Sequence, residues 1–449
     1  MNHKYHQIVV LGAGESGCGA AILAKKQGLE VFVSDGGKIK EKFKQFLLEN
    51  TIPHEELQHT EKRILQADLV VKSPGIPEEV AIIQEIRKAG IDLVSEIEFA
   101  SWFTDAFLVA VTGTNGKTTT TSLLGHIMKN AGLDVCVAGN IGRSFAAALA
   151  ECDHAYFVLE ISSFQLDDIV DFRPDIAVLL NITRNHLDRY QNNFEAYTAS
   201  KMRIIKNQTA ENCLVFNADD ALIQSELAKH PAKAKLFPIS IEKEIKTQGA
   251  FVSNNLIHIN VNQTKFNMTI EQLALQGRHN TSNSMAAGVP AKLLDIRNES
   301  LKQSLSDFQN IAHRIEYVAN VHGVSYYNDS KATTVNATWY AFEDMTKPVV
   351  WIAGGIDKGN DYSILLPLVR DKVRALVCLG RDNKKLIKAF APHIEHIAEA
   401  DNVNQAVTIA SVLAQKGDVV LLSPTCSSFD LFESYEDRGN QFKAAVNAL

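Results

Sequence analysis

Short apolar runs recur along the chain, and a polar or glycine-containing turn follows most of them. Such runs lie at residues 8–11, 31–34, 67–72, 109–111, 135–138, 155–160, 176–180, 324–327, 349–353, 375–380 and 419–423. Runs of this length, spaced by stretches long enough for a helix, predict buried parallel strands that alternate with helices. The sequence therefore predicts an α/β fold, in which residues 211–270 form strands and turns.

The length and two changes of pattern predict the domain organisation. At 449 residues the chain is too long for one hydrophobic core. Near residue 96 a short β-α repeat gives way to the strand at 109–111, and near residue 309 a polar stretch precedes His313. We predict three α/β domains, at residues 1–96, 97–309 and 310–449, whose polar loops face shared clefts.

Composition excludes several classes of function. The chain is 46% hydrophobic and 22% charged, and its formal net charge of −7 gives no reason to expect nucleic acid or an anionic membrane as a partner. Six cysteines are scattered without metal-binding spacing, which favours reduced thiols. No run of about 18 apolar residues occurs, and the N-terminus leads into a strand. We expect a cytoplasmic protein.

The strongest chemical signal follows the strand at 109–111. Gly113-Thr114-Asn115-Gly116-Lys117-Thr118-Thr119 reads as a tight loop that opens a helix, an arrangement that cradles phosphate. Lys117 supplies a positive charge and Thr118 a hydroxyl for Mg²⁺. The usual P-loop begins with a glycine where this chain has Val111, so the loop is a shorter variant. A plain turn is the alternative, and the Gly-Lys-Thr ending favours nucleotide binding.

A second glycine loop follows the first strand. Gly12-Ala13-Gly14-Glu15-Ser16-Gly17 matches the dinucleotide fingerprint, with Asp35 at the end of the next strand. This pattern suits NAD, and it equally suits any nucleotide diphosphate, including a nucleotide-sugar. Ser73-Pro74-Gly75 ends another strand of the same sheet, and a ligand-lining turn and a plain surface turn are equally good interpretations.

Further candidates end the strands beside the phosphate loop. Glu160 ends one strand, where it is well placed to hold Mg²⁺, and His186 follows another. Asn140 lies in a Gly-Asn-Ile-Gly turn that could bring backbone close to a ligand. Composition alone makes Lys201 a solvated surface lysine.

Six motifs in order carry a resemblance to a known family. They lie at residues 113–119, 160–166, 186–190, 313–316, 329–333 and 423–430. Together they resemble the Mur ligases, the ATP-dependent amide-bond-forming enzymes of peptidoglycan precursor synthesis, and the similarity covers essentially the whole chain. Those ligases use the shorter phosphate loop. The chain is most similar to their D-glutamate-adding members, and it has no Asp-Asn-Pro-Arg motif of the diaminopimelate- or lysine-adding type.

The resemblance implies a fold and three groups of binding residues. It implies Rossmann-like first and third domains around a P-loop ATPase-like central domain. UDP-N-acetylmuramoyl-L-alanine would be bound by Gly14, Ser16, Gly17, Asp35 near the uracil, Ser73, Pro74, Gly75 and Asn140. ATP would be bound by Gly113, Thr114, Asn115, Gly116, Lys117, Thr118, Thr119, Asn283, Arg314 and Asp329. D-glutamate would be bound by Lys331, Thr333, Lys358, Ser428 and Tyr435, where Tyr435 replaces an expected Phe.

The resemblance also changes the interpretation of Lys201, which corresponds to a lysine that Mur ligases carbamylate. A carbamate is an anionic oxygen ligand, which suits Mg²⁺. The implied ligands of two Mg²⁺ sites are Thr118, Glu160, His186 and carbamylated Lys201, and the implied catalytic residues are Lys117, Lys201 and His186. Arg184 and Asn185 stand where the family commonly has an acidic residue, which changes the charge near these sites.

The implied reaction transfers the γ-phosphate of ATP to the L-alanine carboxylate, and the amine of D-glutamate then attacks the acyl phosphate. We expect a monomer that acts on small molecules. Within the ligases, the alternatives are another Mur ligase or a folylpolyglutamate synthase-like enzyme. From other classes, the alternatives are an NAD-binding oxidoreductase or regulatory module, and an NTPase switch or motor.

Overall fold

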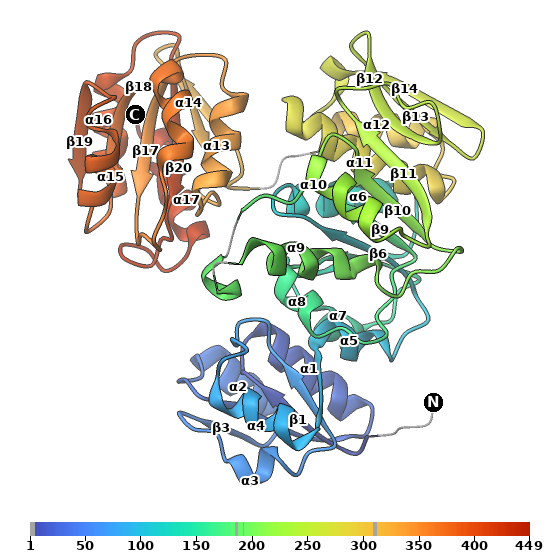
Figure 1. The fold of residues 1–449 in the computed structure, drawn as a ribbon. Helices are drawn as coiled ribbons and strands as arrows, with labels where there is room; N and C mark the ends of the chain where they lie inside the picture. Colours follow the sequence, from blue (N-terminus) through green and yellow to red (C-terminus); the bar gives the residue numbers. More distant parts are fainter. Residues whose placement is uncertain (1–4, 185–186, 192, 309–311) are drawn as a thin grey trace. The chain divides into compact units, whose positions relative to one another are not determined.

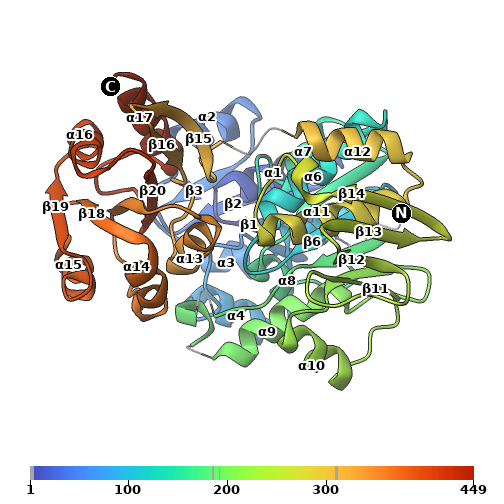
Figure 2. The same ribbon diagram turned by 90° about the horizontal axis from the view of Figure 1, so that it is seen from above.

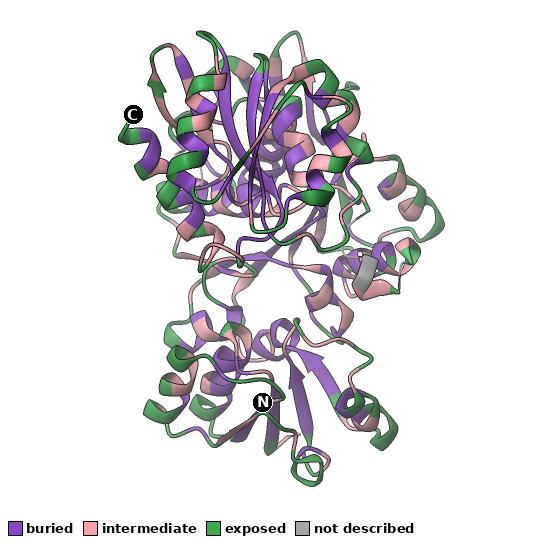
Figure 3. Cartoon of the chain, turned by 90° about the vertical axis from the view of Figure 1, so that its left-hand side faces the viewer, coloured by how far each residue is buried: buried purple, intermediate pink, exposed green. Residues whose placement is uncertain are grey.

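The computed structural model describes residues 5–184, 187–191, 193–308 and 312–449. The chain divides into two compact units, residues 1–276 with 280–308 and residues 277–279 with 309–449 (Figure 1). Both units consist of sheets covered by helices (Figure 3). Central strands such as β1 (Gln7–Leu11), β6 (Phe107–Thr112) and β17 (Val349–Gly354) are almost completely buried, whereas edge strands such as β3 (His54–Glu56), β14 (Thr264–Thr269) and β15 (Glu316–Val321) are partly exposed. The predicted α/β class is confirmed.

The first unit contains a five-stranded parallel sheet in the order β3-β2-β1-β4-β5. Its elements are β1 (Gln7–Leu11), α1 (Glu15–Lys26), β2 (Glu30–Asp35), α2 (Glu41–Glu49), β3 (His54–Glu56), α3 (Glu61–Ile64), β4 (Leu69–Lys72), α4 (Ala81–Ala89), β5 (Asp92–Ser95) and α5 (Glu96–Ser101). Successive residues of β1 face opposite sides, so Ile8 and Val10 belong to one core and Val9 and Leu11 to another.

The same unit contains a nine-stranded sheet in the order β14-β13-β12-β11-β10-β9-β6-β8-β7. Its strands are β6 (Phe107–Thr112), β7 (Val135–Gly139), β8 (Tyr156–Glu160), β9 (Ile176–Leu179), β10 (Cys213–Asn217), β11 (Lys235–Ser240), β12 (Gly249–Ser253), β13 (Leu256–Val261) and β14 (Thr264–Thr269). The strands from β7 to β12 pair in parallel, whereas β12, β13 and β14 form antiparallel hairpins at one edge (Figure 2). Asn254 and Asn255 join β12 to β13 with φ of 49° and 62°, a conformation that asparagine tolerates in tight hairpin turns.

The helices around this sheet are α6 (Lys117–Asn130), α7 (Phe145–Glu151), α8 (Ser163–Asp167), η1 (Leu187–Tyr190), α9 (Phe194–Met202), η2 (Arg203–Ile205), α10 (Ala221–Lys229), η3 (Ile270–Gln272), α11 (Arg278–Leu293) and α12 (Asn298–Asp307). The prediction of only strands and turns for residues 211–270 missed α10. The missed signal is Asp220, whose side chain accepts hydrogen bonds from the N–H groups of Leu222 and Ile223 and so caps the helix.

The two sheets of the first unit share one hydrophobic core, which contains residues of β1, α1, α5, α7 and β8. Helix α1 packs against α7, and Gly19 permits the approach, because a Cβ there would lie 2.1 Å from Ser144 Oγ. Glu98 of α5 accepts hydrogen bonds from the N–H groups of residues 170–172 at 2.7–3.0 Å. The junction is therefore fixed by both apolar packing and a buried carboxylate.

The second unit contains a six-stranded sheet in the order β15-β16-β20-β17-β18-β19, in which only the β15–β16 pair is antiparallel. Its elements are β15 (Glu316–Val321), β16 (Val324–Asn328), α13 (Val335–Asp344), β17 (Val349–Gly354), η4 (Ser363–Leu365), α14 (Leu366–Lys372), β18 (Val373–Leu379), α15 (Lys384–Phe390), β19 (His396–Ala400), α16 (Val403–Leu413), β20 (Val419–Thr425) and α17 (Tyr435–Asn447). Val350 and Ile352 pack on one face of the sheet, and Val349 and Trp351 pack on the other.

Two predictions from composition can be compared with the structure. All six cysteines are free thiols. Among the described residues, no helix is long and apolar enough to span a membrane.

Candidate functional site

The phosphate loop connects β6 to α6, as predicted. Gly113 and Gly116 have φ of 155° and 81°, and a Cβ on Gly116 would lie 2.4 Å from Asn283 Oδ1. The N–H groups of Thr114 and Asn115 donate to the carbonyl and side-chain oxygens of Asn181, at 2.8 and 2.9 Å. These two N–H groups are engaged within the protein, so a bound phosphate would meet the first turn of α6, where N–H groups lack intrahelical acceptors.

Two lysines converge on one carbonyl oxygen of this loop. Lys117 Nζ donates to Gly113 O at 2.9 Å and to Thr114 O at 2.8 Å, and Lys201 Nζ donates to Gly113 O at 2.8 Å. Lys201 lies near the end of α9 and is 1% exposed, so the solvated position that composition favoured is wrong. Burial, and then the charge of Lys117, lower the pKa of Lys201 well below its usual value, although Asp167 and Glu160 oppose this.

Glu160 ends β8 and is 2% exposed. Its Oε1 accepts a hydrogen bond from Asn140 Nδ2 at 2.7 Å, whereas its Oε2 is buried without a hydrogen-bond partner among the described residues. An unpartnered buried carboxylate oxygen fits a hard cation, and the buried hydroxyl of Thr118 is a second oxygen donor. The predicted ligand His186 lies outside the described residues, within which no group of three His, Cys, Asp or Glu ligands occurs.

The predicted nucleotide-diphosphate residues gather at the carboxyl ends of β1, β2 and β4. Gly12 has φ of 88°, and a Cβ there would lie 2.8 Å from Ser73 Oγ. Gly17 must also lack a side chain, because its Cβ would lie 1.8 Å from Gly12 O. Gly14 is the residue before α1, and Ser16 is in the first turn of that helix. The structure thus brings the glycine loop and Ser73 together.

The Asp35 carboxylate contacts backbone on both sides, while its predicted place near the uracil stays a prediction. Its Oδ2 accepts a hydrogen bond from Ala13 N–H at 2.7 Å, and its Oδ1 accepts one from Gly37 N–H at 2.8 Å. Both carboxylate oxygens therefore hold backbone in place, one at the glycine loop and one in the turn after β2. Asp35 shapes the site, and this role was not visible in the sequence.

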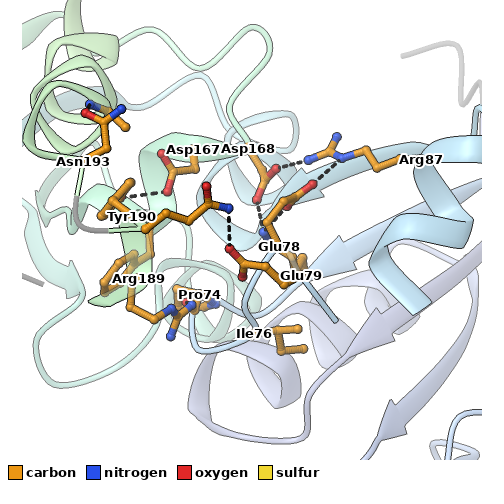
Figure 4. Close-up of a pocket in the computed structure, with 14 residues that line it drawn as sticks. Pro74, Ile76, Glu78, Glu79, Arg87, Asp167, Asp168, Arg189, Tyr190 and Asn193 are labelled. Carbon is orange, nitrogen blue, oxygen red and sulfur yellow. Dashed lines mark hydrogen bonds and ion pairs between the residues drawn. The ribbon is translucent and has the colours of Figure 1, made fainter. Parts of the chain in front are cut away.

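Arg189 of η1 is hydrogen-bonded to the backbone of Pro74 and Gly75. The Arg189 guanidinium donates to Gly75 O at 3.0 Å and to Pro74 O at 3.3 Å, and it lies 4.7 Å from the centre of the Phe164 ring. Beside these contacts is a cavity of about 390 Å³ that sequence reasoning missed (Figure 4). Its wall includes Asp167, which accepts a hydrogen bond from the Tyr190 hydroxyl at 2.9 Å.

In the second unit, the predicted ATP residue Asp329 is 4% exposed. Ser423 Oγ donates to its Oδ2 at 2.8 Å, and Ile315 N–H donates to its Oδ1 at 3.3 Å. Burial raises the pKa of Asp329 to about 7, while the charge of Arg314 acts in the opposite direction. The structure thus links Asp329 to the predicted Arg314 segment. Asn283, the remaining predicted ATP residue outside the loop, belongs to the first unit.

The predicted D-glutamate residues fall on three neighbouring segments of the second unit. Lys331 Nζ lies 5.8 Å from the centre of the Tyr435 ring, and Thr333 N–H donates to Lys331 O. Lys358 is exposed on a loop after β17, and Ser428 is buried. An isolated antiparallel bridge between Ile356 and Ser427 holds these last two segments together.

Sequence reasoning missed Arg438 of α17, which is 1% exposed and joins these segments. Its guanidinium donates to the hydroxyl and carbonyl oxygens of Ser330, both at 2.9 Å, and to Cys426 O at 3.3 Å. Burial lowers the pKa of Arg438 to about 10, against the charges of Asp430, Cys426 and Asp329. A single arginine in a helix gives no sequence signal for such a role, because its acceptors are mostly backbone carbonyls.

Three domain families match the chain. The MurD N-terminal domain matches residues 7–81, the Mur ligase middle domain matches residues 111–291, and the Mur ligase glutamate ligase domain matches residues 313–426. The relative from Christiangramia forsetii, a UDP-N-acetylmuramoylalanine--D-glutamate ligase, is 52% identical over 99% of both chains. Relatives with the same name from Porphyromonas gingivalis and Bacteroides fragilis are 51% and 52% identical, over 99% of this chain and 99% and 100% of their own.

The chain belongs to the Mur ligase family. The predicted resemblance is confirmed, including the similarity to the D-glutamate-adding members. As a Mur ligase, the protein is an ATP-dependent ligase, and the NAD-dependent oxidoreductase and the NTPase switch are not supported.

Solved Mur ligase structures share the fold at low sequence identity. The UDP-N-acetylmuramate-alanine ligase MurC of Thermotoga maritima is 17% identical over 99% of both chains, with a TM-score of 0.60. The MurF ligase of Thermotoga maritima is 15% identical over 93% of this chain and 95% of its own, with a TM-score of 0.61. These similarities support the architecture of three sheets found in this Mur ligase.

Proposed function

We propose that this Mur ligase adds D-glutamate to UDP-N-acetylmuramoyl-L-alanine and that it cleaves ATP to ADP and phosphate. The observation that carries the proposal is the identity of 51–52%, over nearly whole chains, with relatives that are all named UDP-N-acetylmuramoylalanine--D-glutamate ligase. The chain has one proposed binding element for each substrate. These are the phosphate loop for ATP, the glycine loop after β1 for the UDP precursor, and the cationic Lys331 and Lys358 for D-glutamate.

In the first half-reaction, an oxygen of the L-alanine carboxylate attacks the γ-phosphorus of ATP, and the bond from that phosphorus to the β,γ-bridging oxygen breaks. ADP leaves and an acyl phosphate remains. Lys117 and the first turn of α6 bind the phosphates and offset their charge. The residues of the glycine loop and Asn140 would hold the precursor. Its carboxylate is then already positioned for attack, and the loss of translational and rotational entropy is not added to the barrier of the reaction.

In the second half-reaction, the amine of D-glutamate attacks the carbonyl carbon of the acyl phosphate. The resulting tetrahedral intermediate expels phosphate, the nitrogen loses a proton, and an amide remains. Lys331, Thr333, Lys358, Ser428 and Tyr435 are the residues proposed to bind D-glutamate. Tyr435 keeps the aromatic ring expected at its position and adds a hydroxyl.

Two Mg²⁺ ions would be held by Thr118, Glu160, His186 and carbamylated Lys201. When bound, Mg²⁺ neutralises phosphate oxygens on the donor and acceptor sides of the transfer. The unpartnered Glu160 Oε2 supports this ligand set. The burial of Lys201 supports the carbamate, because a neutral Nζ can add to the carbon of CO₂ and then lose a proton, which gives an anionic oxygen ligand.

The organisation of the protein follows from the same proposal. We place the precursor-binding domain at residues 1–96, the ATP-binding domain at 97–309 and the amino-acid-binding domain at 310–449. The protein would act in the cytoplasm as a monomer on small-molecule substrates.

The test measures phosphate release from ATP and Mg²⁺ in the presence of UDP-N-acetylmuramoyl-L-alanine and one amino acid. We expect D-glutamate to support release, whereas L-glutamate, L-lysine and meso-diaminopimelate do not. Reactions without the precursor are the control and should release no phosphate above background. Release that does not depend on D-glutamate would contradict the proposal, and release with another of these amino acids would identify a different Mur ligase.

A further inference from the structure

Lys358 lies in a turn that is built around the carboxylate of Asp357. Asp357 Oδ1 accepts hydrogen bonds from Gly359 N–H at 2.7 Å and from Asn360 N–H at 3.0 Å. A side-chain oxygen that binds the N–H groups two and three residues later closes a tight turn. Gly359 has φ of 86°, a conformation that glycine adopts without strain. One carboxylate therefore holds the backbone on both sides of Lys358.

Further hydrogen bonds join this turn to the loop after β20, which carries Ser428. Ile356 N–H donates to Ser427 O at 2.9 Å, and Ser427 N–H donates to Ile356 O at 3.3 Å. The side chain of Asn360 donates through Nδ2 to Thr425 O at 3.1 Å. Because these bonds come before and after the turn in the chain, the turn and the loop after β20 are held together at two points.

Asp357 forms an ion pair with Lys385 of α15. Lys385 Nζ lies 2.9 Å from Asp357 Oδ1, and the Tyr362 hydroxyl donates to Oδ2 at 2.7 Å. Burial alone would raise the pKa of Asp357, but the bonds from Lys385, Tyr362 and the two N–H groups of the turn outweigh it and lower the pKa, so the carboxylate is ionised. Lys358 is exposed and has no ion-pair partner among the described residues.

We propose that Asp357 and Lys385 are positioning residues for the amino-acid substrate. Asp357 fixes the backbone of Lys358, and Lys385 occupies the carboxylate that would otherwise attract the Lys358 ammonium. The inference rests on the proposed function, in which Lys358 binds D-glutamate. A turn that is ordered before the substrate arrives lowers the entropic cost of binding. An ammonium without a carboxylate partner in the protein is available to a carboxylate of the substrate.

The experiment measures kcat and KM of the full chain for D-glutamate, ATP and UDP-N-acetylmuramoyl-L-alanine by phosphate release. Asp357→Ala removes the acceptor of the turn, and we expect KM for D-glutamate to rise about tenfold while kcat and the other two KM values stay within about twofold. The amide oxygen of Asp357→Asn can still accept from both N–H groups, so KM for D-glutamate should stay within about threefold of the wild type. The matched control is Asp361→Ala, because Asp361 is exposed in the same loop and accepts from Ser363 N–H, outside the turn.

Lys385→Met tests the charge separately, and it should fold because the Lys385 side chain is 51% exposed. The unpaired Asp357 carboxylate should then attract Lys358, and KM for D-glutamate should rise about fivefold. The double variant Lys385→Met/Asp357→Asn should recover most of this increase, since a neutral amide does not compete for Lys358. Lys384→Met, at an exposed position of the same helix, should keep the wild-type KM.

The inference is overturned if Asp357→Ala or Lys385→Met keeps the wild-type KM for D-glutamate, or if the double variant is no better than Lys385→Met. It is also overturned if the KM values of all three substrates rise together, because that would indicate a general structural role. Wild-type phosphate release that does not depend on D-glutamate would overturn the proposed function and the inference together. D-glutamate-dependent release with unchanged KM values in the variants would overturn the inference alone.

Discussion

Lys72 and Lys201 are both buried, but in different surroundings. Lys72, at the end of β4, is 6% exposed, and its Nζ lies 2.7 Å from Asp168 Oδ2 and 3.2 Å from Glu78 Oε2. Lys201 is 1% exposed, donates to the carbonyl oxygen of Gly113, and has a second lysine beside it. The first lysine is in ion-pair contact with carboxylates, whereas the charges of Asp167 and Glu160 only partly offset the effects of burial and of Lys117 on the second.

This difference decides which chemistry each lysine can perform. A buried ammonium that is paired with a carboxylate stays charged and contributes to structure, since removal of either partner leaves an uncompensated charge. A buried ammonium beside another cation is destabilised, so that the neutral amine is favoured. The neutral amine is the form that reacts with CO₂. Burial is the largest cause of the lowered pKa of Lys201, but burial alone does not identify a reactive lysine, because the charges beside it also act on the pKa.

The largest effect is expected for Lys201→Ala. Without the proposed carbamate, the metal site loses an anionic ligand, and D-glutamate-dependent phosphate release should fall by about 1,000-fold. Bicarbonate or a short carboxylate added to the variant should restore part of the activity. The readout is phosphate release with and without the added carboxylate, together with the apparent affinity for Mg²⁺.

Lys206→Ala is the matched control for Lys201→Ala, because Lys206 follows the same helix but is exposed. It should keep the wild-type rate. Full activity of Lys201→Ala without added carboxylate would refute a role for Lys201 as a metal ligand. Lys201, like Lys72, would then have a structural role only.

A smaller effect, on stability, is expected for Lys72→Met. The substitution leaves Asp168 with one cationic partner, Arg87, whose Nη2 lies 2.7 Å from Asp168 Oδ1. We expect the free energy of unfolding in denaturant to fall by about 3 kcal/mol. In the double variant Lys72→Met/Asp168→Asn much of this loss should be recovered, because no buried carboxylate remains without its partner.

The exposed lysine of α4 gives the control for this measurement. Lys88 forms an ion pair with Glu85 at 2.6 Å, and its side chain is 70% exposed. Lys88→Ala should leave the unfolding curve unchanged, since water screens such pairs. If Lys72→Met behaved like Lys88→Ala, the pair between Lys72 and Asp168 would be no more than a surface contact.

The sequence led to a proposed function for Lys201, through the family resemblance, but to no prediction for Lys72. Apolar runs predicted the α/β class and the strand ends where candidate residues gather, because strand burial is a local property of the sequence. Composition misplaced Lys201 in solvent, and only the resemblance to Mur ligases gave it a function. The partnership of Lys72 with Asp168 could not be predicted, because it joins strand β4 to the end of helix α8 and depends on how two sheets pack. For the same reason the engagement of Asp35 with Ala13 N–H was visible only in the structure.

Glu96 tests whether burial shifts the pKa of a carboxylate in the same way, towards the uncharged form. Glu96 is 1% exposed, accepts a hydrogen bond from Ala146 N–H at 2.5 Å, and has a buried Oε2 without a hydrogen-bond partner among the described residues. Burial raises the pKa of Glu96 to about 7, against the hydrogen bonds from Ala146 and Ser144. Since the folded protein then binds this proton more tightly than the unfolded chain, stability is greatest below about pH 4.5 for this group. It should fall by about 1.4 kcal/mol per pH unit up to about pH 7 and stay constant above it.

Glu96→Gln should remove this contribution, because an amide does not titrate, and the variant should be more stable than the wild type above about pH 7. The measurement is denaturant unfolding of both proteins across this pH range, with the exposed Glu61→Gln as a control that keeps the wild-type slope. An unchanged slope in Glu96→Gln would mean that the carboxylate is solvated or paired in solution. If the dependence of the free energy of unfolding on pH disappears in Glu96→Gln, burial favours the uncharged form of Glu96 as it does for Lys201. The pKa of the carboxylate is then raised, whereas that of the lysine is lowered.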